Sequence, residues 1–430
     1  MTPTEPQPEG PDVTAVMVLD HSAEGRGYLV ARLLEDPSNK DEPYKLSFRE
    51  TPRIPAGLEG LVVRDCPAHL RPSEPVHAVV STKSGTCLAE KAWETVVRPL
   101  LELLQGLGGA ESGAGYEVHV TQSEDTIKEF AQGLGGDHGA QPAVILLAGD
   151  GGTAELLNAR NRDSPPPAIA ILPFGTGNAL FHSLHKPLYT PGGPTPLVHG
   201  LRTLWKGTPS PLPVFSARFP PGSKLVSAGE DPDAWAGVEE LIGAVVFSHG
   251  FHASLIWESD TPRYREHGAA RFGMVAAELL REAHAYEVEI SVRGPGPGDR
   301  RPLRRVEGEE APEGNVRRVG YILVAMVSNL EQTFAISPGS APLDGKMRAV
   351  HFGPVGGERT MEIMTAAYDG GRHVEMRDVG YEEVEGMELS ILDADARWRK
   401  VCVDGTTVEV PAGGKVRLER ASSPVQVLVQ

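Results

Sequence analysis

The spacing of apolar residues changes twice along the chain. Between residues 13 and 65, short apolar-rich runs such as VTAVMVL and YKLSF predict strands. From 76 to about 207, strand-like runs alternate with helical stripes. The runs AVILLA and AIAIL are continuously apolar, as in parallel strands covered on both faces. After about 210 the pattern predicts many strands and one helix, AARFGMVAAELLREA. The predicted fold class is therefore α/β plus β: a doubly wound α/β domain, then a β-rich, sandwich-like domain.

The pattern divides the chain into parts that differ in predicted secondary structure. We expect a disordered, Pro-rich start at 1–12, a β-rich extension at 13–75, the α/β domain at 76–210 and the β-rich domain at 211–430. The extension is either a separate small β domain or a set of extra strands of the C-terminal domain, and we favour the second. A Pro-rich segment, 187–237, is predicted to be a loop insertion.

Charge narrows the range of partners. The chain of 430 residues carries a formal net charge of −17, which argues against nucleic acid as a partner and against a strong electrostatic membrane anchor. A local basic patch is compatible with this charge. The segment 293–318 holds seven Arg. It is either a solvated loop or a contact for anionic lipid head groups.

The compartment is also predicted from composition. Three Cys, at 66, 87 and 402, form no metal pattern and no disulfide framework, which fits a reducing, cytoplasmic environment. The start of the chain lacks the features of a signal peptide. Because no apolar run approaches the roughly 20 residues that span a bilayer, we expect no transmembrane segment.

Three glycine-bearing turns follow predicted strands of the α/β domain: STKSGT at 81–86, AGDGGT at 148–153 and PFGTGNA at 173–179. Ligands of open α/β sheets bind at the carboxyl ends of strands, and backbone N–H groups at helix starts favour anions. Any one turn could be a plain strand–helix connection, and none is a Walker A loop or a GxGxxG fingerprint. The set predicts a phosphate-bearing ligand. Asp150, between glycines, suits a base for an attacking hydroxyl or a Mg²⁺ ligand.

The ordered motifs resemble those of the diacylglycerol kinase catalytic domain superfamily, and most closely its sphingosine (long-chain base) kinases. They are SGT, then GDG with Glu155 and Asn158 on the following helix, then GTGNA. The segment FSHGFHASLIWESDTPRYREHGAARFG is similar to a sphingosine kinase segment, and APLDGKM and VDGTTV are similar to later motifs. The resemblance runs from about 76 to 410, and it implies a fold related to that of NAD kinase.

The resemblance implies ATP-dependent phosphorylation of a lipid hydroxyl, with Mg²⁺, by a protein that contacts intracellular membranes peripherally. Asp150 would be the catalytic acidic residue. The residues implied to bind the nucleotide are Ser84, Gly85, Gly149, Gly151, Gly152, Glu155, Gly175, Thr176, Gly177, Asn178, Arg265, Arg271 and Asp404. Ser254 and Glu258 would contact the substrate, and Asp344 a metal ion. The two Arg could instead form surface ion pairs with nearby acids, and Asp344 and Asp404 could simply form Asp-Gly hairpin turns.

The sequence also departs from the family pattern. Cys87 stands at or near the last Gly of the first motif, and Gly152 stands where the family has Thr. Thr406 replaces the Glu of the terminal DGE motif, and Ser254 stands where sphingosine kinases place the Asp that holds the lipid amine. We therefore weigh three hypotheses: a lipid kinase for a sphingoid base or diacylglycerol, a nucleotide-binding pseudokinase, and a kinase for a soluble hydroxyl such as that of NAD.

Overall fold

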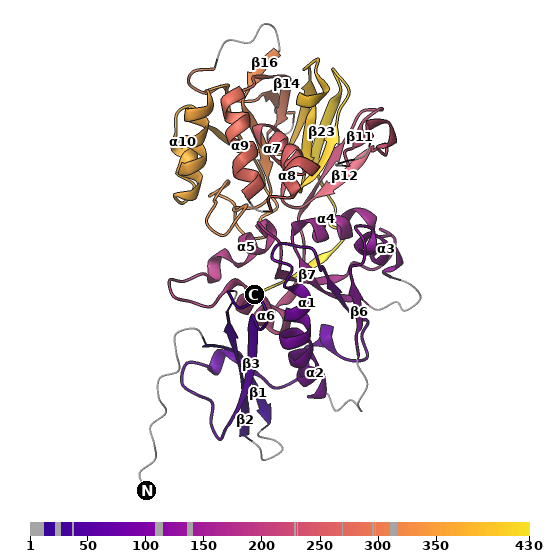
Figure 1. Ribbon diagram of the computed structural model, residues 1–430, viewed down its shortest axis with the longest axis vertical. Coiled ribbons are helices and arrows are strands. Elements are labelled where there is room, and N and C mark those ends of the chain that lie inside the picture. Colours follow the sequence, from indigo (N-terminus) through magenta and orange to yellow (C-terminus); the bar gives the residue numbers. More distant parts are fainter. Residues whose placement is uncertain are drawn as a thin grey trace.

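The computed structural model consists of three regions stacked along its long axis (Figure 1). It describes residues 13–21, 27–36, 38–107, 115–135, 141–227, 229, 231–268, 270–294, 296, 298–309 and 316–430. The predicted disordered start, 1–12, lies outside the described residues. A small sheet lies at one end, an α/β region in the middle and a β-rich region at the other end.

The N-terminal strands form a four-stranded sheet of their own, in the order β3-β2-β1-β4. Their bounds are β1 Val13–His21, β2 Gly27–Glu35, β3 Tyr44–Thr51 and β4 Val62–Val63. Met17 and Leu19 of β1 are buried in the same core as Leu201 of helix α6 (Pro196–Lys206). The expectation that these strands extend the C-terminal domain is therefore wrong, because they pack on the α/β region instead.

The central sheet has the order β6-β5-β7-β8-β24-β9. Its strands are β5 Val76–Val80, β6 Glu117–Val120, β7 Ala143–Ala148, β8 Ala168–Pro173, β9 Thr208–Pro211 and β24 Gln426–Val429. The first four are parallel. β7 is buried along its whole length and β8 along all but its last residue, Pro173, as their continuous apolar runs predict. β24 was predicted to belong to the β-rich domain, but it returns from the end of the chain to pair in parallel with β8.

Helices cover both faces of this sheet. They are α1 Ala89–Ala92, a π-helical turn Trp93–Val97, α2 Arg98–Gly106, α3 Thr126–Gly133, α4 Asp150–Ala159, α5 Ala179–His185 and α6. The π turn runs directly into the helical turn that contains Pro99, which cannot donate a backbone hydrogen bond.

The Pro-rich segment 187–237 is not the loop insertion that we predicted, because it contains α6 and strands β9 to β11. The Thr195 side chain caps α6 by accepting a hydrogen bond from Val198 N at 3.2 Å. Pro196 occupies the first turn, where its missing N–H costs nothing. Leu197, Leu201 and Leu204 then form a buried helical stripe. Their spacing could have predicted this helix from the sequence.

The β-rich region is a sandwich of two antiparallel sheets. The first has the order β12-β10-β23-β20-β14-β15, with β16 also on β14, and the second has the order β11-β22-β21-β13-β17-β18-β19. The strands of the first sheet are β10 Val214–Arg218, β12 Glu240–Gly243, β14 Tyr286–Arg293, β15 Arg300–Pro302, β16 Val316–Val319, β20 Gly386–Ile391 and β23 Lys415–Ala421. Those of the second are β11 Lys224–Leu225, β13 Val246–Gly250, β17 Tyr321–Ala325, β18 Met347–Phe352, β19 Gly380–Val384, β21 Lys400–Val403 and β22 Thr406–Glu409.

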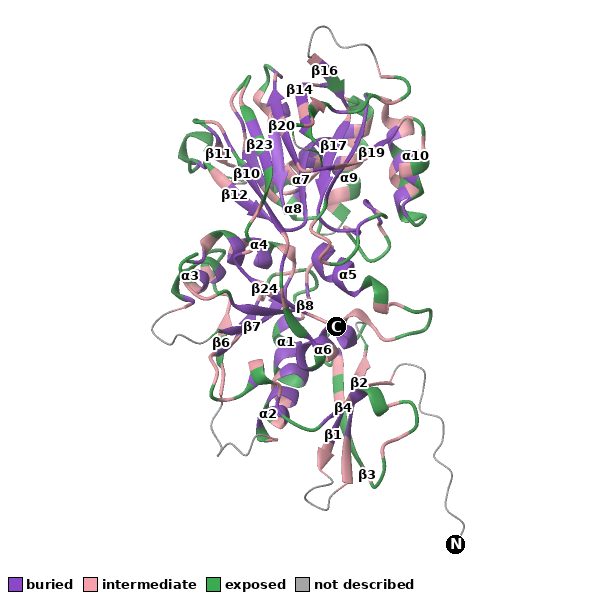
Figure 2. Ribbon diagram, turned by 180° about the vertical axis from the view of Figure 1, so that it is seen from behind, coloured by how far each residue is buried: buried purple, intermediate pink, exposed green. Residues whose placement is uncertain are grey.

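The inner faces of both sheets share one buried core (Figure 2). Phe215, Val288 and Leu389 come from the first sheet, and Phe247 and Val324 come from the second. This is the packing expected for two face-to-face sheets, and it confirms the predicted fold class.

More helices accompany the sandwich than the single one predicted. They are α7 Phe251–Ser259, α8 Pro262–Arg265, α9 Ala270–Glu282 and α10 Gly357–Tyr368. Of these helices, only α9 was predicted from the helical spacing of its apolar residues. Helix α7 follows β13 directly, and the strand ends at Gly250, which has a φ of +86°. Of the helices in the described part of the chain, none is both long enough and apolar enough to cross a bilayer.

Candidate active site

Asp150 is the first residue of α4, immediately after β7 and Gly149. Its Oδ2 accepts a hydrogen bond from Ala179 N at 2.8 Å, and its Oδ1 accepts one from Leu180 N at 3.0 Å. Both donors lie in the first turn of α5, where backbone N–H groups lack helical partners. Burial raises the pKa of Asp150, and these two hydrogen bonds oppose that rise. The start of one helix thus fixes the carboxylate at the start of another.

The three glycine turns meet at the carboxyl edge of the sheet, as predicted. A Cβ placed on Gly149 would lie 2.8 Å from Gly175 Cα, and one on Gly85 would lie 2.4 Å from Phe174 O. Real Cβ atoms do not approach other atoms so closely. Glycine at these positions therefore allows the first and second turns to touch the third.

Polar side chains fix the shape of these turns. Asn178 has a φ of +53°. Its Oδ1 accepts from Gly175 N at 2.7 Å, and its Nδ2 donates to Gly175 O at 2.9 Å. In the first turn, Ser84 Oγ lies 2.6 Å from Ser81 Oγ. Asn178 therefore holds the backbone of the third turn, and the Ser84 hydroxyl is engaged with that of Ser81.

The outward side of the turns consists of exposed small residues. Gly85, Gly151 and Thr176 are exposed, and Gly177 is partly exposed. Gly152 instead lies buried in the packing of α4 on α3, where an added Cβ would come within 3.3 Å of Ile127 Cδ1. The exposed side is the surface that a ligand can reach.

Glu155 lies one turn further along α4. Burial raises the pKa of its carboxyl to about 7, and the negative charges of Asp125 and Glu124 add to that rise. Its Oε2 is buried and has no hydrogen-bond partner. An unsatisfied buried oxygen is costly when the carboxyl is charged, which agrees with its raised pKa.

Arg265 and Arg271 come from the β-rich region. Arg265 Nε and a terminal NH₂ donate to the two oxygens of Asp260 at 2.9 and 2.8 Å, and Arg271 lies 3.9 Å from the same carboxylate. The ion pairs considered from sequence are thus present, with Asp260 as the partner. Arg271 Nε is buried without a hydrogen-bond partner. Arg265 also interacts electrostatically with Glu124, which precedes α3. The two cations therefore lie near the α/β region.

Asp404 has an internal role. Its carboxylate accepts backbone hydrogen bonds from Ala244, Val245 and Val246 at 2.6 to 3.2 Å. Burial raises its pKa to about 7 against these bonds, and the charge of Asp150 adds to the rise. With a φ of +49°, Asp404 also forms the hairpin turn between β21 and β22. Asp404 therefore organises the strand junction next to the site, and Thr406 follows it on β22.

The Asp344 carboxylate bonds to backbone groups of the turn in which it lies. It accepts from Ala341 N and Lys346 N, and it pairs with Arg348 at 2.9 Å. Among the described residues, Asp344 is in no group of three His, Cys, Asp or Glu side chains close enough to hold an ion. This arrangement gives the predicted metal role no support.

The two predicted substrate residues lie on α7. Ser254 is buried, and its Oγ lies 2.8 Å from Tyr286 Oη. Glu258 pairs with Arg397 at 2.8 Å. Sequence reasoning missed Tyr286 and Arg397, because both are far from α7 along the chain.

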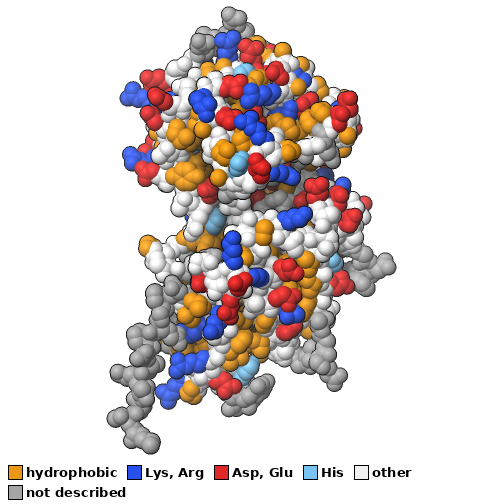
Figure 3. Space-filling model, in the orientation of Figure 1, with side chains coloured by type: hydrophobic (Ala, Val, Ile, Leu, Met, Phe, Trp, Pro, Cys, Tyr) orange, Lys and Arg blue, Asp and Glu red, His pale blue; other side chains and the backbone are white. Residues whose placement is uncertain are grey.

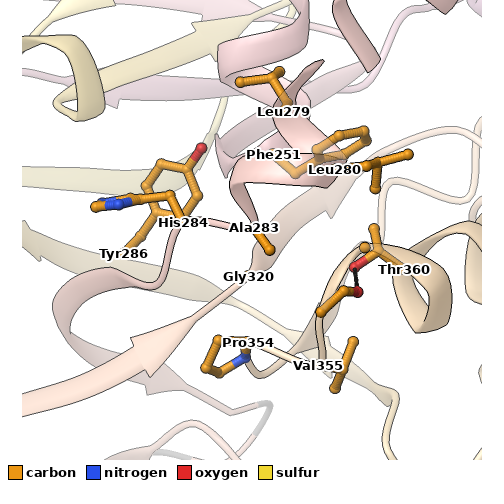
Figure 4. A pocket seen from close by; sticks show the side chains of 12 residues that line it. Phe251, Leu279, Leu280, Ala283, His284, Tyr286, Gly320, Pro354, Val355 and Thr360 are labelled. Carbon is orange, nitrogen blue, oxygen red and sulfur yellow. Dashed lines mark hydrogen bonds between the residues drawn. The ribbon is translucent and has the colours of Figure 1, made fainter. Parts of the chain in front are cut away.

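Tyr286, the partner of Ser254, lines a narrow, largely apolar pocket (Figure 4). It lies between the start of α7, the end of α9 and the start of α10. Its lining includes Phe251, Leu279, Leu280, Tyr286, Val355 and Thr360.

The Arg-rich segment 293–318 is mostly ion-paired where the structure describes it. Arg301 pairs with Glu382, Arg317 with Glu309, and Arg300 with Glu388. It also contains β15 and β16, so it is not simply a loop. These ion pairs favour the interpretation of this segment as a solvated surface over a contact with anionic lipid.

The turns lie at the junction of the two larger regions, where a Cβ on Gly177 would come 2.9 Å from Leu330 O. Arg265 lies near this junction through its interaction with Glu124. The surface is hollowed at this junction (Figure 3). Contacts across it include Ser183 Oγ, which accepts from Asn329 N at 3.0 Å, and Asn158, which exchanges two hydrogen bonds with Ile242.

Comparison with known proteins agrees with this arrangement. Residues 75–213 match the family model described as diacylglycerol kinase catalytic domain. No curated protein gives a sequence match. Two solved structures from Bacillus anthracis str. Sterne, described as candidate diacylglycerol kinases, are similar in fold. One has 14% identity and a TM-score of 0.53, and covers 83% of this chain and 95% of its own. The other has 13% identity and a TM-score of 0.52, and covers 83% and 97%.

At these identities the structures establish the fold alone. The family match covers the central α/β region and supports a phosphotransferase, with the acceptor left open. The specific likeness to sphingosine kinases rests on the sequence motifs. Residues 75–213 of the chain match the diacylglycerol kinase catalytic domain.

Proposed function

We propose that this protein is an ATP-dependent kinase that transfers the γ-phosphate to the hydroxyl of a lipid. The observation that carries the proposal is the meeting of three glycine turns around Asp150, whose carboxylate is held by Ala179 N and Leu180 N. Phosphoryl transfer depends mainly on positioning and charge stabilisation, and this site offers both.

The turns fit a nucleotide triphosphate. The exposed Gly85, Gly151 and Thr176 leave the backbone open to phosphate oxygens, and the first N–H groups of α4 favour negative charge. Arg265 and Arg271 offer further donors, one of them a buried Nε that lacks a partner. Asp260 would share these cations with the phosphates.

Mg²⁺ would neutralise charge on the phosphates when bound. It is usually held by one or two carboxylates together with phosphate oxygens, so Asp150 alone among the site residues would suffice on the protein side. Asp344 is not needed for this role.

Asp150 would also orient the acceptor and take its proton. Each carboxylate oxygen already accepts one backbone N–H, which fixes the group and leaves further lone pairs for an O–H donor. Burial raises the pKa of the carboxyl towards the range in which a base works well near neutral pH, whereas a bound Mg²⁺ would lower this pKa again.

The residues around Ser254 favour a neutral lipid such as diacylglycerol over a cationic sphingoid base. A hydroxyl pair, Ser254 and Tyr286, occupies the position where an ammonium group would need a carboxylate. The nearest acid on α7, Glu258, is already paired with Arg397. The adjacent pocket is lined by apolar side chains but has room for little more than one water molecule, so it would have to widen to receive part of an acyl chain. Access to such a substrate requires peripheral contact with an intracellular membrane.

A second candidate function is ATP binding without turnover. Thr406 favours it, because a carboxylate that the resembled family has at this point is absent. The choice between the two functions depends on whether Asp150 and the remaining donors suffice for transfer.

The test is an acceptor panel. The purified chain is incubated with Mg²⁺ and γ-labelled ATP, and with mixed micelles of dioleoylglycerol or of sphingosine, or with NAD in the absence of lipid. We expect label in the dioleoylglycerol product. Label on NAD alone would refute the lipid acceptor. ATP binding without transfer, with activity gained in Thr406→Glu, would establish the binding function instead.

A further inference from the structure

Two histidines and a glutamate converge on one face of the central sheet, away from the glycine turns. His77 Nδ1 lies 3.3 Å from His119 Nε2 and 3.5 Å from a Glu117 carboxylate oxygen. His119 Nε2 lies 3.7 Å from that same oxygen. Within the described part of the chain, this is the one group of three His, Cys, Asp or Glu side chains whose ligand atoms lie close enough together to hold a metal ion.

Strand pairing produces this arrangement. β5 and β6 are parallel neighbours, and His77 stands directly beside Glu117. Glu117 and His119 are two positions apart on β6, so both project from the same face. The group could not be recognised from sequence, because His77 is far from Glu117 and His119 along the chain and only the strand register brings them together.

His77 and Glu117 lie at the ends of β5 and β6 opposite the candidate active site, and His119 lies one residue before the end of β6. His77 is near the start of β5, whereas the first glycine turn follows the end of that strand. Phe130 of α3 packs against both imidazole rings, with ring centroids 5.4 Å from His77 and 4.5 Å from His119. This packing restricts the orientation of the rings, so the ligand atoms are held before any ion binds.

The distances match those of zinc ligands. Tetrahedral Zn²⁺ with Zn–N and Zn–O bonds of about 2.0–2.1 Å places its ligand atoms about 3.3 Å apart. The three separations observed, 3.3, 3.5 and 3.7 Å, require only small side-chain adjustments to reach that value. We propose that His77, Glu117 and His119 form a binding site for Zn²⁺ or a similar divalent transition metal, at the edge of the sheet.

The chemistry of the ligands selects the metal. Two imidazoles and one carboxylate suit Zn²⁺, whereas Mg²⁺ prefers oxygen ligands in an octahedron. The Glu117 side chain is 72% exposed and that of His119 is 30% exposed, so the fourth position faces solvent. A metal there ties the edge strand β6 to β5 and stabilises the folded chain through binding. The site does not depend on the proposed kinase function.

The test is metal binding by the full chain after chelator treatment. Zn²⁺ is titrated in competition with a chromogenic chelator, in the presence of excess Mg²⁺. We expect one Zn²⁺ per chain. Loss of a supporting group costs about 10–100-fold in affinity, so His119→Ala, which removes a ligand, should cost at least ~100-fold. Glu117→Gln should also weaken binding clearly.

The matched control is His267→Ala. His267 Nε2 lies 3.5 Å from a carboxylate oxygen of Glu266, so this pair resembles the His77–Glu117 pair but lacks a second histidine. The loss of the His267 imidazole should leave Zn²⁺ affinity unchanged. Thermal unfolding without metal checks that the variants are folded, and the exposed Glu117→Gln keeps the test valid if His119→Ala fails. Absence of stoichiometric binding, or equal affinity in Glu117→Gln and the wild type, would refute the site and leave a simple His–His hydrogen bond.

Discussion

Two glycines of the candidate phosphate site should respond in opposite ways to the addition of one methyl group. A Cβ on Gly175 would lie 2.4 Å from Gly149 Cα and 2.9 Å from Asn178 Oδ1. Because the nearest atom is backbone, the two turns must separate. Overpacking of this kind costs about 1–3 kcal/mol. Gly175→Ala should therefore lower the stability of the protein and disturb the site.

Gly151 offers the matched comparison. It is exposed on the first turn of α4, its φ is not positive, and an added Cβ would meet nothing within 4 Å. Replacing such a glycine by Ala stabilises a protein by about 0.4–1 kcal/mol. If phosphates bind against this surface, the same methyl group should weaken ATP binding. A clash that costs about 1–2 kcal/mol corresponds to a ~5–30-fold loss of affinity.

Both effects can be measured on the same preparations. Thermal unfolding without nucleotide gives the stability change, and calorimetric titration with ATP gives the affinity. We expect Gly151→Ala to unfold at a slightly higher temperature than the wild type and to bind ATP more weakly. If it binds ATP like the wild type, the phosphates do not lie against α4. If Gly175→Ala is as stable as the wild type, the close contact of the turns is refuted.

Two further predictions concern Asp404 and Cys87. Burial raises the pKa of Asp404 from its ordinary value of 3.8 to about 7, so between these pH values the folded chain keeps a proton that the unfolded chain has released. Its contribution to stability then falls as pH rises, by at most about 1.4 kcal/mol per pH unit. Asp404→Asn should flatten urea-unfolding stability between pH 4 and 7, and an unchanged slope would contradict this origin. Cys87 has a φ of +61°, which costs an L-residue about 1–2 kcal/mol. Cys87→Gly should therefore raise thermal stability, and an equal gain in Cys87→Ala would show that strain is not the cause.

The layered fold and the meeting of the glycine turns could be predicted from sequence. Continuous apolar runs such as AVILLA identify buried parallel strands, and the carboxyl ends of such strands share one edge. Asp150 therefore had to lie near the turn at 173–179. The hydrogen bonds from Ala179 N and Leu180 N follow from this closeness. They could not be predicted individually, because backbone donors do not depend on the residue type.

Other features depend on pairings that the local sequence does not encode. The N-terminal strands could have joined any sheet with a free edge, and their place is decided by packing against the α/β region, including Leu201 of α6. α6 itself was hidden by Pro196, which indicates a loop unless Thr195 is recognised as a helix cap. β24 pairs with β8 from the far end of the chain.

The role of a matched motif residue is equally hard to predict. Asp404 and Asn178 occupy family motifs, yet their side chains bond to the backbone of this chain. Arg265 has the expected type and position, and its ion pair with Asp260 was one of the alternatives that the sequence left open. Residue identity limits what a side chain can do, whereas its partners decide what it does.

The most direct test of the account compares the wild type with Asp150→Asn in a lipid phosphorylation assay. The substitution keeps the size of the side chain but removes the base, whose loss typically costs about 10²–10⁴-fold in rate. It also replaces one of the two oxygens that accept backbone N–H groups by an NH₂ group, which cannot accept. Asp163→Asn, an exposed change in the loop after α4, serves as the control. We predict that dioleoylglycerol phosphorylation falls by at least ~100-fold in Asp150→Asn alone, while ATP affinity measured without Mg²⁺ changes only a few-fold. Phosphorylation at the wild-type rate in Asp150→Asn would contradict the central claim that this carboxylate performs the transfer chemistry.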